Sequence, residues 1–136
     1  MIQTMYARRQ PTSPADEAAI AVAKPTVQTI PLVFSSPHSG TRYPADFIAA
    51  SRLDPLALRR SEDSFVDEIF AAAPRLGAPL VQALFARAYC DPNREPYELD
   101  PTMFEDELPA FANTASLRVT GGLGSISRVV GSGTEI

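Results

Sequence analysis

Histidine, cysteine and long apolar segments are nearly absent from this chain of 136 residues. The single cysteine, Cys90, excludes a disulfide within the chain and fits a reducing compartment. No apolar stretch approaches the length of a membrane span, and the arginine pair near the N-terminus has no apolar run after it. We therefore expect a cytoplasmic protein without an export signal.

An excess of positive charge is also missing. The 12 lysines and arginines face 16 aspartates and glutamates, which gives a net charge of −4. This balance offers no electrostatic footprint for nucleic acid. Nearly all the basic residues are arginines, whose forked guanidinium group suits the recognition of carboxylates.

The apolar content of 45% is sufficient for one compact domain. Thirteen prolines stand at most of the boundaries between predicted elements, which indicates short elements joined by ordered, irregular loops. We expect residues 1–19 to form a partly disordered leader. Residues 20–136 would then belong to a single domain.

Two short apolar segments predict strands. Residues 32–34 follow Pro31 and precede two serines, a pattern typical of a strand buried on both faces. Residues 78–85 predict a second strand. Residues 20–23 are compatible with a strand or with a helix that begins at residues 13–16, and the pattern does not separate the two.

Helices are predicted between the two strands. Residues 44–50 predict a short helix, and Asp54 and Pro55 supply the cap and first-turn proline of another. Over residues 61–73, apolar side chains fall on one stripe about 140° wide, which predicts a longer helix capped by Ser61. The strand–helix–strand order predicts an α/β fold with a parallel strand pair.

The only histidine, His38, directly follows the first predicted strand. Strand ends in α/β proteins are where ligand and metal sites gather. Glu62 and Asp63 are the candidate acids that could share a metal with it, although 25 residues of separation is no local ligand signature. The alternative is that both acids only satisfy a helix N-terminus.

A polar cluster follows the second predicted strand. Arg87, Asn93 and Arg94 could bind an anionic substrate, with Arg94 holding a carboxylate through two parallel hydrogen bonds. An ordinary turn at Asp91, with Arg94 paired on the surface to Asp91 or Glu95, explains the same residues. The sequence leaves both interpretations open.

Two other features of the sequence do not indicate a catalytic or binding site. Cys90 has no base to activate it other than His38, so we interpret it as a small buried residue. Residues 121–124 do not match a phosphate-binding loop, because a lysine and a following helix pattern are missing. They predict turns, with Gly121 or Gly124 at positive φ.

Four segments in this order resemble the N-formylglutamate amidohydrolase (N-formylglutamate deformylase) family. They are residues 32–40, residues 62–67, Arg87 with residues 91–94, and residues 122–133. The similarity runs from about Ile20 to the last residue, and four ordered motifs are more specific than any one alone.

The resemblance implies a mixed sheet flanked by helices, similar to the zinc-carboxypeptidase-like (phosphorylase/hydrolase-like) fold, with one zinc ion above the strand ends. His38 would be the first zinc ligand and Asp63 the second, with Glu62 as the close alternative. Asn93 and Arg94 would bind the substrate carboxylate, assisted by Arg87.

The family's reaction is zinc-dependent hydrolysis of the formamide bond of N-formyl-L-glutamate to glutamate and formate, a step of histidine catabolism. Family members are much longer, and their second half carries another zinc-binding histidine and a general-base glutamate. We therefore expect an incomplete copy of the fold, with the general base beyond Ile136. The alternatives are a non-catalytic truncated fragment, or a related N-acyl amino acid amidase or carboxypeptidase-like hydrolase.

Overall fold

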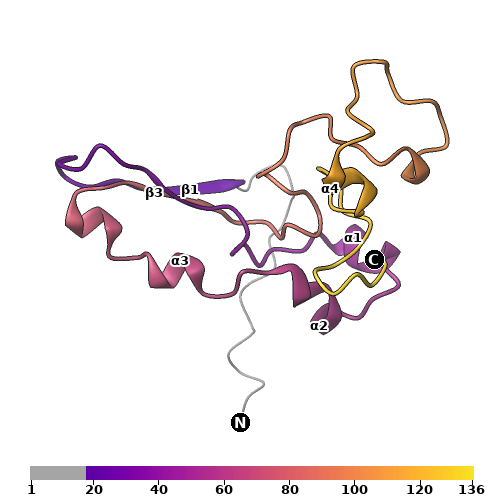
Figure 1. Cartoon of the computed structure of the whole chain (residues 1–136). Coiled ribbons are helices and arrows are strands. Elements are labelled where there is room, and N and C mark those ends of the chain that lie inside the picture. Colours follow the sequence, from indigo (N-terminus) through magenta and orange to yellow (C-terminus); the bar gives the residue numbers. More distant parts are fainter. Residues whose placement is uncertain (1–17) are drawn as a thin grey trace, which may run out of the picture.

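The computed structural model describes residues 18–136, so most of the predicted leader and the possible helix start at residues 13–16 lie outside the described residues. The described chain is built from short elements joined by long loops (Figure 1). In chain order they are β1 (Ile20–Ala23), β2 (Phe34–Ser36), α1 (Ala45–Ala50), α2 (Pro55–Leu58), η2 (Arg59–Ser61), α3 (Val66–Ile69), η3 (Ala73–Leu76), β3 (Leu80–Ala83), η4 (Pro101–Met103) and α4 (Leu117–Thr120).

The three strands form one mixed sheet in the order β1-β3-β2. β3 is antiparallel to β1, with Val81 opposite Val22, and parallel to β2, with Leu80 opposite Phe34. A parallel pair requires a crossover connection, which the segment between β2 and β3 supplies. The predicted α/β class and parallel pair are therefore confirmed, and residues 20–23 form a strand.

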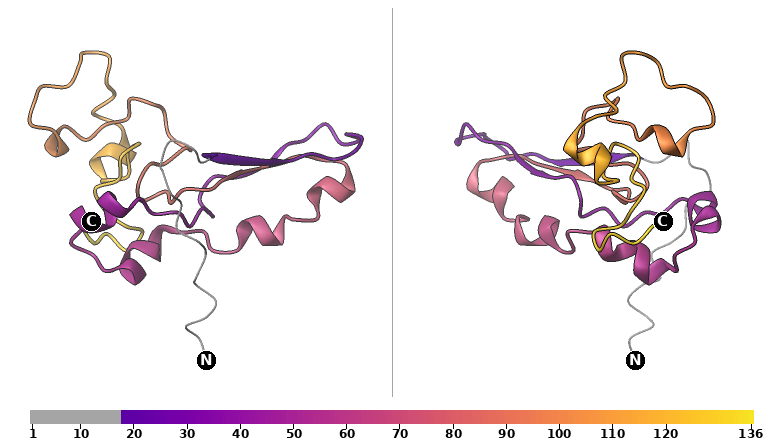
Figure 2. Two further views of the ribbon diagram at one scale, coloured as in Figure 1. Left: turned by 180° about the vertical axis from the view of Figure 1, so that it is seen from behind. Right: turned by 45° about the vertical axis from the view of Figure 1, so that its right-hand side comes forward.

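One face of the sheet is covered by the part of the crossover that carries α3 and η3, as two further views show (Figure 2). The rings of Phe34 and Phe70 lie 5.3 Å apart across this contact. On the β1 edge of the sheet, Ile20 and Val22 remain 52% and 45% exposed. The prediction of a strand buried on both faces is wrong at residues 32–34, because Leu32 and Val33 are largely exposed and the strand begins at Phe34.

The predicted helix over residues 61–73 is wrong in its extent. Only α3 and the later 3-10 helix η3 form, and Phe65 just before α3 adopts a left-handed conformation with φ 67°. Ser61 does not cap a helix; its hydroxyl accepts a hydrogen bond from Gly131 N at 3.0 Å. The amide of Asp63 donates to His38 O, also at 3.0 Å. Tertiary contacts thus override the local helical pattern.

The shorter helix predictions are confirmed. α1 covers residues 45–50, and Asp54 caps α2 by accepting a hydrogen bond from Ala57 N at 2.8 Å. α4 has no predicted counterpart; its cap is Ser116, which accepts from Val119 N. No helix of the described part is both long and apolar enough to cross a membrane.

The prediction of a positive φ at Gly121 or Gly124 is wrong. Gly121 has φ −79° and Gly124 has no positive φ, whereas Gly122 between them has φ 74°. Gly124 is instead required by a close approach, because an added Cβ atom would lie 2.4 Å from Glu98 O. The segment is thus a packed crossing of two backbones as well as a turn.

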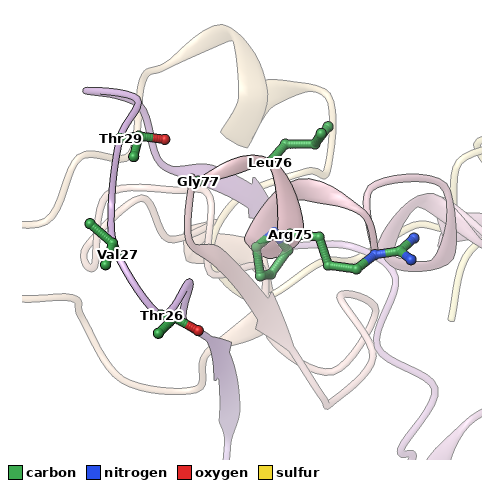
Figure 3. Close-up of a pocket in the computed structure, with 7 residues that line it drawn as sticks. Thr26, Val27, Thr29, Arg75, Leu76 and Gly77 are labelled. Carbon is green, nitrogen blue, oxygen red and sulfur yellow. The ribbon is translucent and has the colours of Figure 1, made fainter.

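A pocket lies where the loop after β1 meets η3 (Figure 3). Its lining residues are Thr26, Val27, Thr29, Pro74, Arg75, Leu76 and Gly77. Gly77 O accepts hydrogen bonds from the amides of Thr29 and Ile30 and so closes this loop onto η3. The lining contains neither histidine nor a carboxylate, so this pocket offers no hydrolytic chemistry.

Candidate active site

His38 lies in the loop that follows β2 and is only 7% exposed. The hydroxyls of Ser36 and Ser39 share a buried hydrogen bond of 2.7 Å that closes the loop. Gly40 lets the loop press on the chain that leaves β3, because an added Cβ atom would lie 2.1 Å from Phe85 O. The sequence therefore places the imidazole beside the polar cluster that begins at residue 87.

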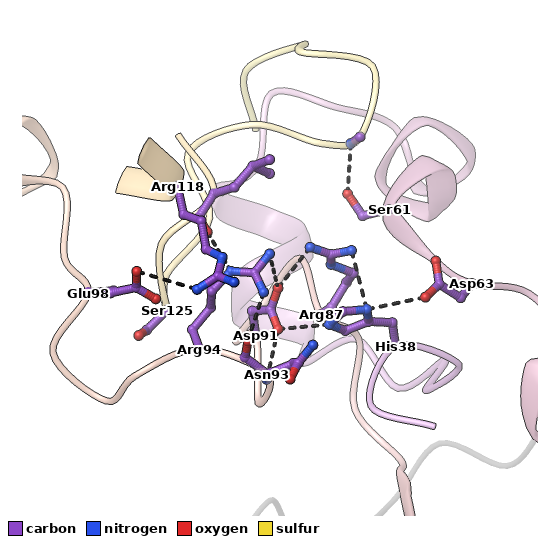
Figure 4. A network of polar contacts seen from close by, with 12 residues as sticks. His38, Ser61, Asp63, Arg87, Asp91, Asn93, Arg94, Glu98, Arg118 and Ser125 are labelled. Carbon is purple, nitrogen blue, oxygen red and sulfur yellow. Dashed lines mark hydrogen bonds and ion pairs between the residues drawn. The ribbon is translucent and has the colours of Figure 1, made fainter. Parts of the chain in front are cut away.

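The imidazole ring is held between two carboxylates (Figure 4). Its Nε2 atom lies 2.8 Å from Asp91 Oδ1, and its Nδ1 atom lies 3.2 Å from Asp63 Oδ2. Both carboxylates can only accept, and the contact at Nε2 is the shorter of the two, so we assign the single proton of the neutral ring to Nε2. The lone pair of Nδ1 then faces Asp63 and Arg87, whose Nη1 atom is 3.4 Å away.

Asp91 is the functional residue that the sequence interpretation missed. Its side chain is fully buried, and it accepts from Arg87 Nη2 at 2.8 Å and from the amide of Asn93 at 2.9 Å. Arg94 Nη2 lies 3.3 Å from the same carboxylate. The available signal was its position just past the second strand, four residues after Arg87 and three before Arg94.

The surroundings of Asp91 favour the ionised form of its carboxyl group. Burial alone would raise the pKa of this carboxyl, but the hydrogen bonds from His38 and from the amide of Asn93 outweigh it. Electrostatic interactions with His38 and Arg87 act in the same direction, so the pKa of Asp91 lies below its ordinary value. The arrangement therefore presents a fixed negative charge to the Nε2 side of the imidazole.

Asp63 meets His38 through both its backbone and its side chain. Its amide donates to His38 O at 3.0 Å, while its carboxylate faces Nδ1 and its side chain is 54% exposed. The structure therefore brings together two residues that are 25 positions apart in the sequence. The two groups present a ring nitrogen and a carboxylate oxygen on one accessible side.

Glu62 points elsewhere. Its side chain is 1% exposed and accepts hydrogen bonds from Arg59 Nε and Nη2 at 2.9–3.1 Å. The hydroxyl of Tyr43 donates to the same carboxylate at 2.8 Å. Burial raises the pKa of Tyr43, and so do the hydrogen bond and the charge of Glu62. This geometry favours Asp63 over Glu62 as the partner of His38.

The predicted anion-binding residues are near the imidazole but are largely engaged by the protein. Arg94 donates from Nε to Leu123 O at 2.9 Å and from Nη1 to Asn93 O at 2.7 Å, and its side chain is only 11% exposed. Arg94 does pair with Asp91, as the alternative interpretation expected, but the pair is buried instead of lying on the surface. Its role in holding a substrate carboxylate stays a prediction, as do the roles of Asn93 and Arg87.

Cys90 lies next to Asp91 and is partly buried. Burial raises the pKa of its thiol, and the neighbouring charge of Asp91 raises it further. The thiol is therefore a poor nucleophile, in agreement with its interpretation as a packing residue.

The donor chemistry at His38 suits a zinc ion. Zinc binds imidazole nitrogen and carboxylate oxygen, and its histidine ligands usually donate their other N–H group to a carboxylate, as His38 does to Asp91. However, catalytic zinc ordinarily has three protein ligands. Within residues 18–136 no group of three or more His, Cys, Asp or Glu side chains could hold a metal ion. The residues present therefore fit zinc as two of its ligands.

The comparisons with known proteins point to one family. The family model for N-formylglutamate amidohydrolase matches residues 30–136. A crystal structure of N-formylglutamate amidohydrolase from Ralstonia eutropha JMP134 is 39% identical, with a TM-score of 0.77, over 88% of this chain and 42% of that one. The chain thus spans less than half of that protein's length, and no curated protein matches it. With the family match extending over most of its residues, the chain belongs to the N-formylglutamate amidohydrolase family.

Proposed function

We propose that this chain provides part of an active site that hydrolyses the formamide bond of N-formyl-L-glutamate to glutamate and formate, with zinc as cofactor. The observation that supports it is the imidazole of His38 held between Asp91 and Asp63 in a member of this family. A zinc-carboxypeptidase-like fold, a place in histidine degradation and a cytoplasmic location belong to the same proposal.

The Nδ1 atom of His38 and the carboxylate of Asp63 would hold the zinc ion, which when bound supplies Lewis acidity for amide hydrolysis. Asp91 keeps the proton on Nε2 of His38 and fixes the orientation of the ring. Residues 18–136 contain no group of three or more metal-binding side chains, so the third ligand and the general base would lie outside these described residues.

Substrate binding would use the positive charge around Asp91. Arg87 and Arg94 place two guanidinium groups against the carboxylates of Asp91 and Asp63, and a bound zinc ion would make the neighbourhood positive, so it would attract an anion. Holding a substrate carboxylate there orients the formyl group toward His38, and such positioning can supply several kcal/mol of barrier reduction. Asn93, adjacent to Arg94, would add a further hydrogen bond.

Removing either proposed ligand tests this function. In a protein that carries the rest of the site, we expect His38→Ala and Asp63→Asn each to abolish zinc binding, measured by competition with a chromophoric chelator, and to abolish formate release from N-formyl-L-glutamate. Glu62→Gln is the matched control at the neighbouring acid, and it should retain zinc because its carboxylate faces Arg59 and Tyr43. Normal zinc binding by Asp63→Asn would discard the assignment.

A non-catalytic role is the competing function, and the two-ligand site is the observation that favours it. Zinc that is lost entirely on dialysis, together with no release of formate, would support this alternative. A related amidase is distinguished by its substrates. Turnover of N-acetyl or longer N-acyl amino acids in preference to N-formyl-L-glutamate would show it.

A further inference from the structure

The segment of residues 122–125 ties together two arginines from distant parts of the chain. Leu123 O accepts a hydrogen bond from Arg94 Nε at 2.9 Å, and Leu123 N donates to Arg118 O at 2.7 Å. One residue therefore holds the side chain of Arg94 and the backbone of Arg118. The glycine-rich segment, which the sequence predicts only as turns, thus positions both arginines.

The same segment fixes two buried acids. Ser125 O accepts from the amide of Asp91, and Ser125 N donates to Glu98 O, both at 2.8 Å. The missing side chain of Gly124 permits this crossing, because a Cβ atom would collide with Glu98 O. The backbone of Ser125 thus bonds to both Asp91 and Glu98. The carboxylate of Asp91 pairs with Arg94, and the carboxylate of Glu98 lies beside Arg118.

Arg87, Arg94 and Arg118 form what we name the arginine row. Figure 4 shows their guanidinium groups following one another away from His38, with Asp91 between the first two. Arg87 and Arg94 are 16% and 11% exposed, and both pair with Asp91. The Arg118 side chain is 59% exposed, and its contact with Glu98 is long, at 3.8 Å. Within the described part, its guanidinium group makes no hydrogen bond, so Arg118 has the most donor capacity to offer a ligand.

We propose that Arg118 binds the side-chain carboxylate of the substrate and so selects a dicarboxylate over an N-formyl amino acid with a neutral side chain. This assignment rests on the proposed function, which places the formyl group at His38. The α-carboxylate, two bonds from the amide nitrogen, then falls nearest to Arg87 and Arg94. The side-chain carboxylate, four bonds from the same nitrogen, falls toward the outer end of the row.

The contact with Glu98 positions the guanidinium group of Arg118, although the side chain is largely exposed. The carboxylate of Glu98 is 3% exposed and anchors one side of Arg118, whose other side remains accessible. A guanidinium group has five N–H donors in a planar fork, enough to serve Glu98 and a second carboxylate together.

Binding of a charged and a neutral ligand of the same shape tests the assignment. The whole chain, kept metal-free with a chelator so that no turnover occurs, is titrated calorimetrically with N-formyl-L-glutamate and with N-formyl-L-glutamine. We expect Arg118→Gln to weaken binding of the glutamate compound about 10- to 100-fold, the range for a hydrogen bond to a charged group. Binding of the glutamine compound should not change.

Arg75→Gln is the matched control, because Arg75 is an exposed arginine on η3 that lines a different pocket. Arg118→Lys should give an intermediate loss, since lysine keeps the charge but not the fork. If Arg118→Gln fails to fold because the buried Glu98 loses its charged partner, the double variant Glu98→Gln/Arg118→Gln removes both charges and should show the same selective loss.

Different results would overturn the role of Arg118 and the proposed function. An Arg118→Gln variant that still prefers the glutamate compound as strongly as the unmodified chain overturns the role of Arg118 alone. Equal loss for both compounds also overturns it, since that result shows a general structural effect. An unmodified chain that binds neither compound overturns the proposed function itself, and the role of Arg118 with it.

Discussion

At the scale of single residues, the candidate site depends on which atoms of His38 are occupied. Asp91 takes the Nε2 side, which leaves Nδ1 directed at Asp63. Glu62, the residue next to Asp63, is drawn to the opposite side by Arg59 and Tyr43. The two adjacent acids thus have different surroundings, because the Glu62 side chain is buried against Arg59 and Tyr43, whereas the Asp63 side chain is half exposed beside His38.

The orienting role of Asp91 predicts the effect of its neutralisation. Asp91→Asn should weaken zinc binding roughly 10- to 100-fold, the range seen when a carboxylate behind a ligand histidine is removed. It should also cost about 1.5–3 kcal/mol of stability, because Arg87 and Arg94 lose a charged partner. Chelator competition and urea denaturation measure the two effects.

Asp46→Asn is the control for that substitution, since Asp46 is an exposed aspartate whose carboxylate accepts only from the amide of Phe47 among the described contacts. It should change neither quantity appreciably. Unchanged zinc affinity in Asp91→Asn would show that Asp91 does not orient the histidine.

At the scale of elements, the loop after β2 is what delivers the imidazole to its partners. Gly40 allows this loop to lie against the backbone that leaves β3, at a distance no side chain tolerates. The isolated bridge between Arg42 and Phe85 continues the parallel pairing beyond the strands themselves. The site is therefore held by backbone contacts at the ends of β2 and β3.

This close approach predicts that Gly40→Ala displaces the loop. Overpacking of this kind typically costs 1–3 kcal/mol, so we expect a loss of stability of about that size in urea denaturation. Zinc binding should weaken too, because His38 moves with the loop. Gly121→Ala is the milder control, since its Cβ atom would lie 3.2 Å from Leu117 O and φ is −79°. Equal effects of the two substitutions would contradict the special role of Gly40.

At the scale of the whole molecule, distant segments are joined by a few charged contacts. Arg128 Nε donates to Asp100 Oδ2 at 2.9 Å and so links the loop around η4 to the C-terminal segment. Burial opposes ionisation of Asp100, but hydrogen bonds from Thr102 and Arg128 hold the pKa of this carboxyl below its ordinary value of 3.8.

A lowered pKa in the folded state fixes the sign of the pH dependence. Ionised Asp100 stabilises the folded chain above pH 3.8, and this contribution is lost as the pH falls below that value. Asp100→Asn should therefore destabilise the chain near neutral pH and match the unmodified chain in strong acid, as measured by urea denaturation across pH. A destabilisation that persists undiminished in acid would contradict this linkage, and the exposed Asp106→Asn serves as control.

Much of the fold and part of the site were predictable from local sequence. The cap at Asp54 and the helix predicted at residues 44–50 follow from short-range patterns, which the structure confirms. The presence of two strands in these regions is confirmed as well, although they cover residues 34–36 and 80–83 instead of the predicted 32–34 and 78–85. The helix at residues 61–73 failed because Ser61 and Asp63 bond to Gly131 and His38 instead of to their own neighbours. Local periodicity cannot report such contacts.

The sequence by itself determined which side chains are available: one histidine, a pair of acids and arginines grouped after a strand. It also carried the ordered motifs that mark the family. Only the tertiary structure decided which atoms meet. It directed Asp63 to His38 and Glu62 to Arg59, and it buried Asp91 among cations. The reason is physical, because a carboxylate's partner is set by burial and by distances across the fold, neither of which neighbouring residues encode.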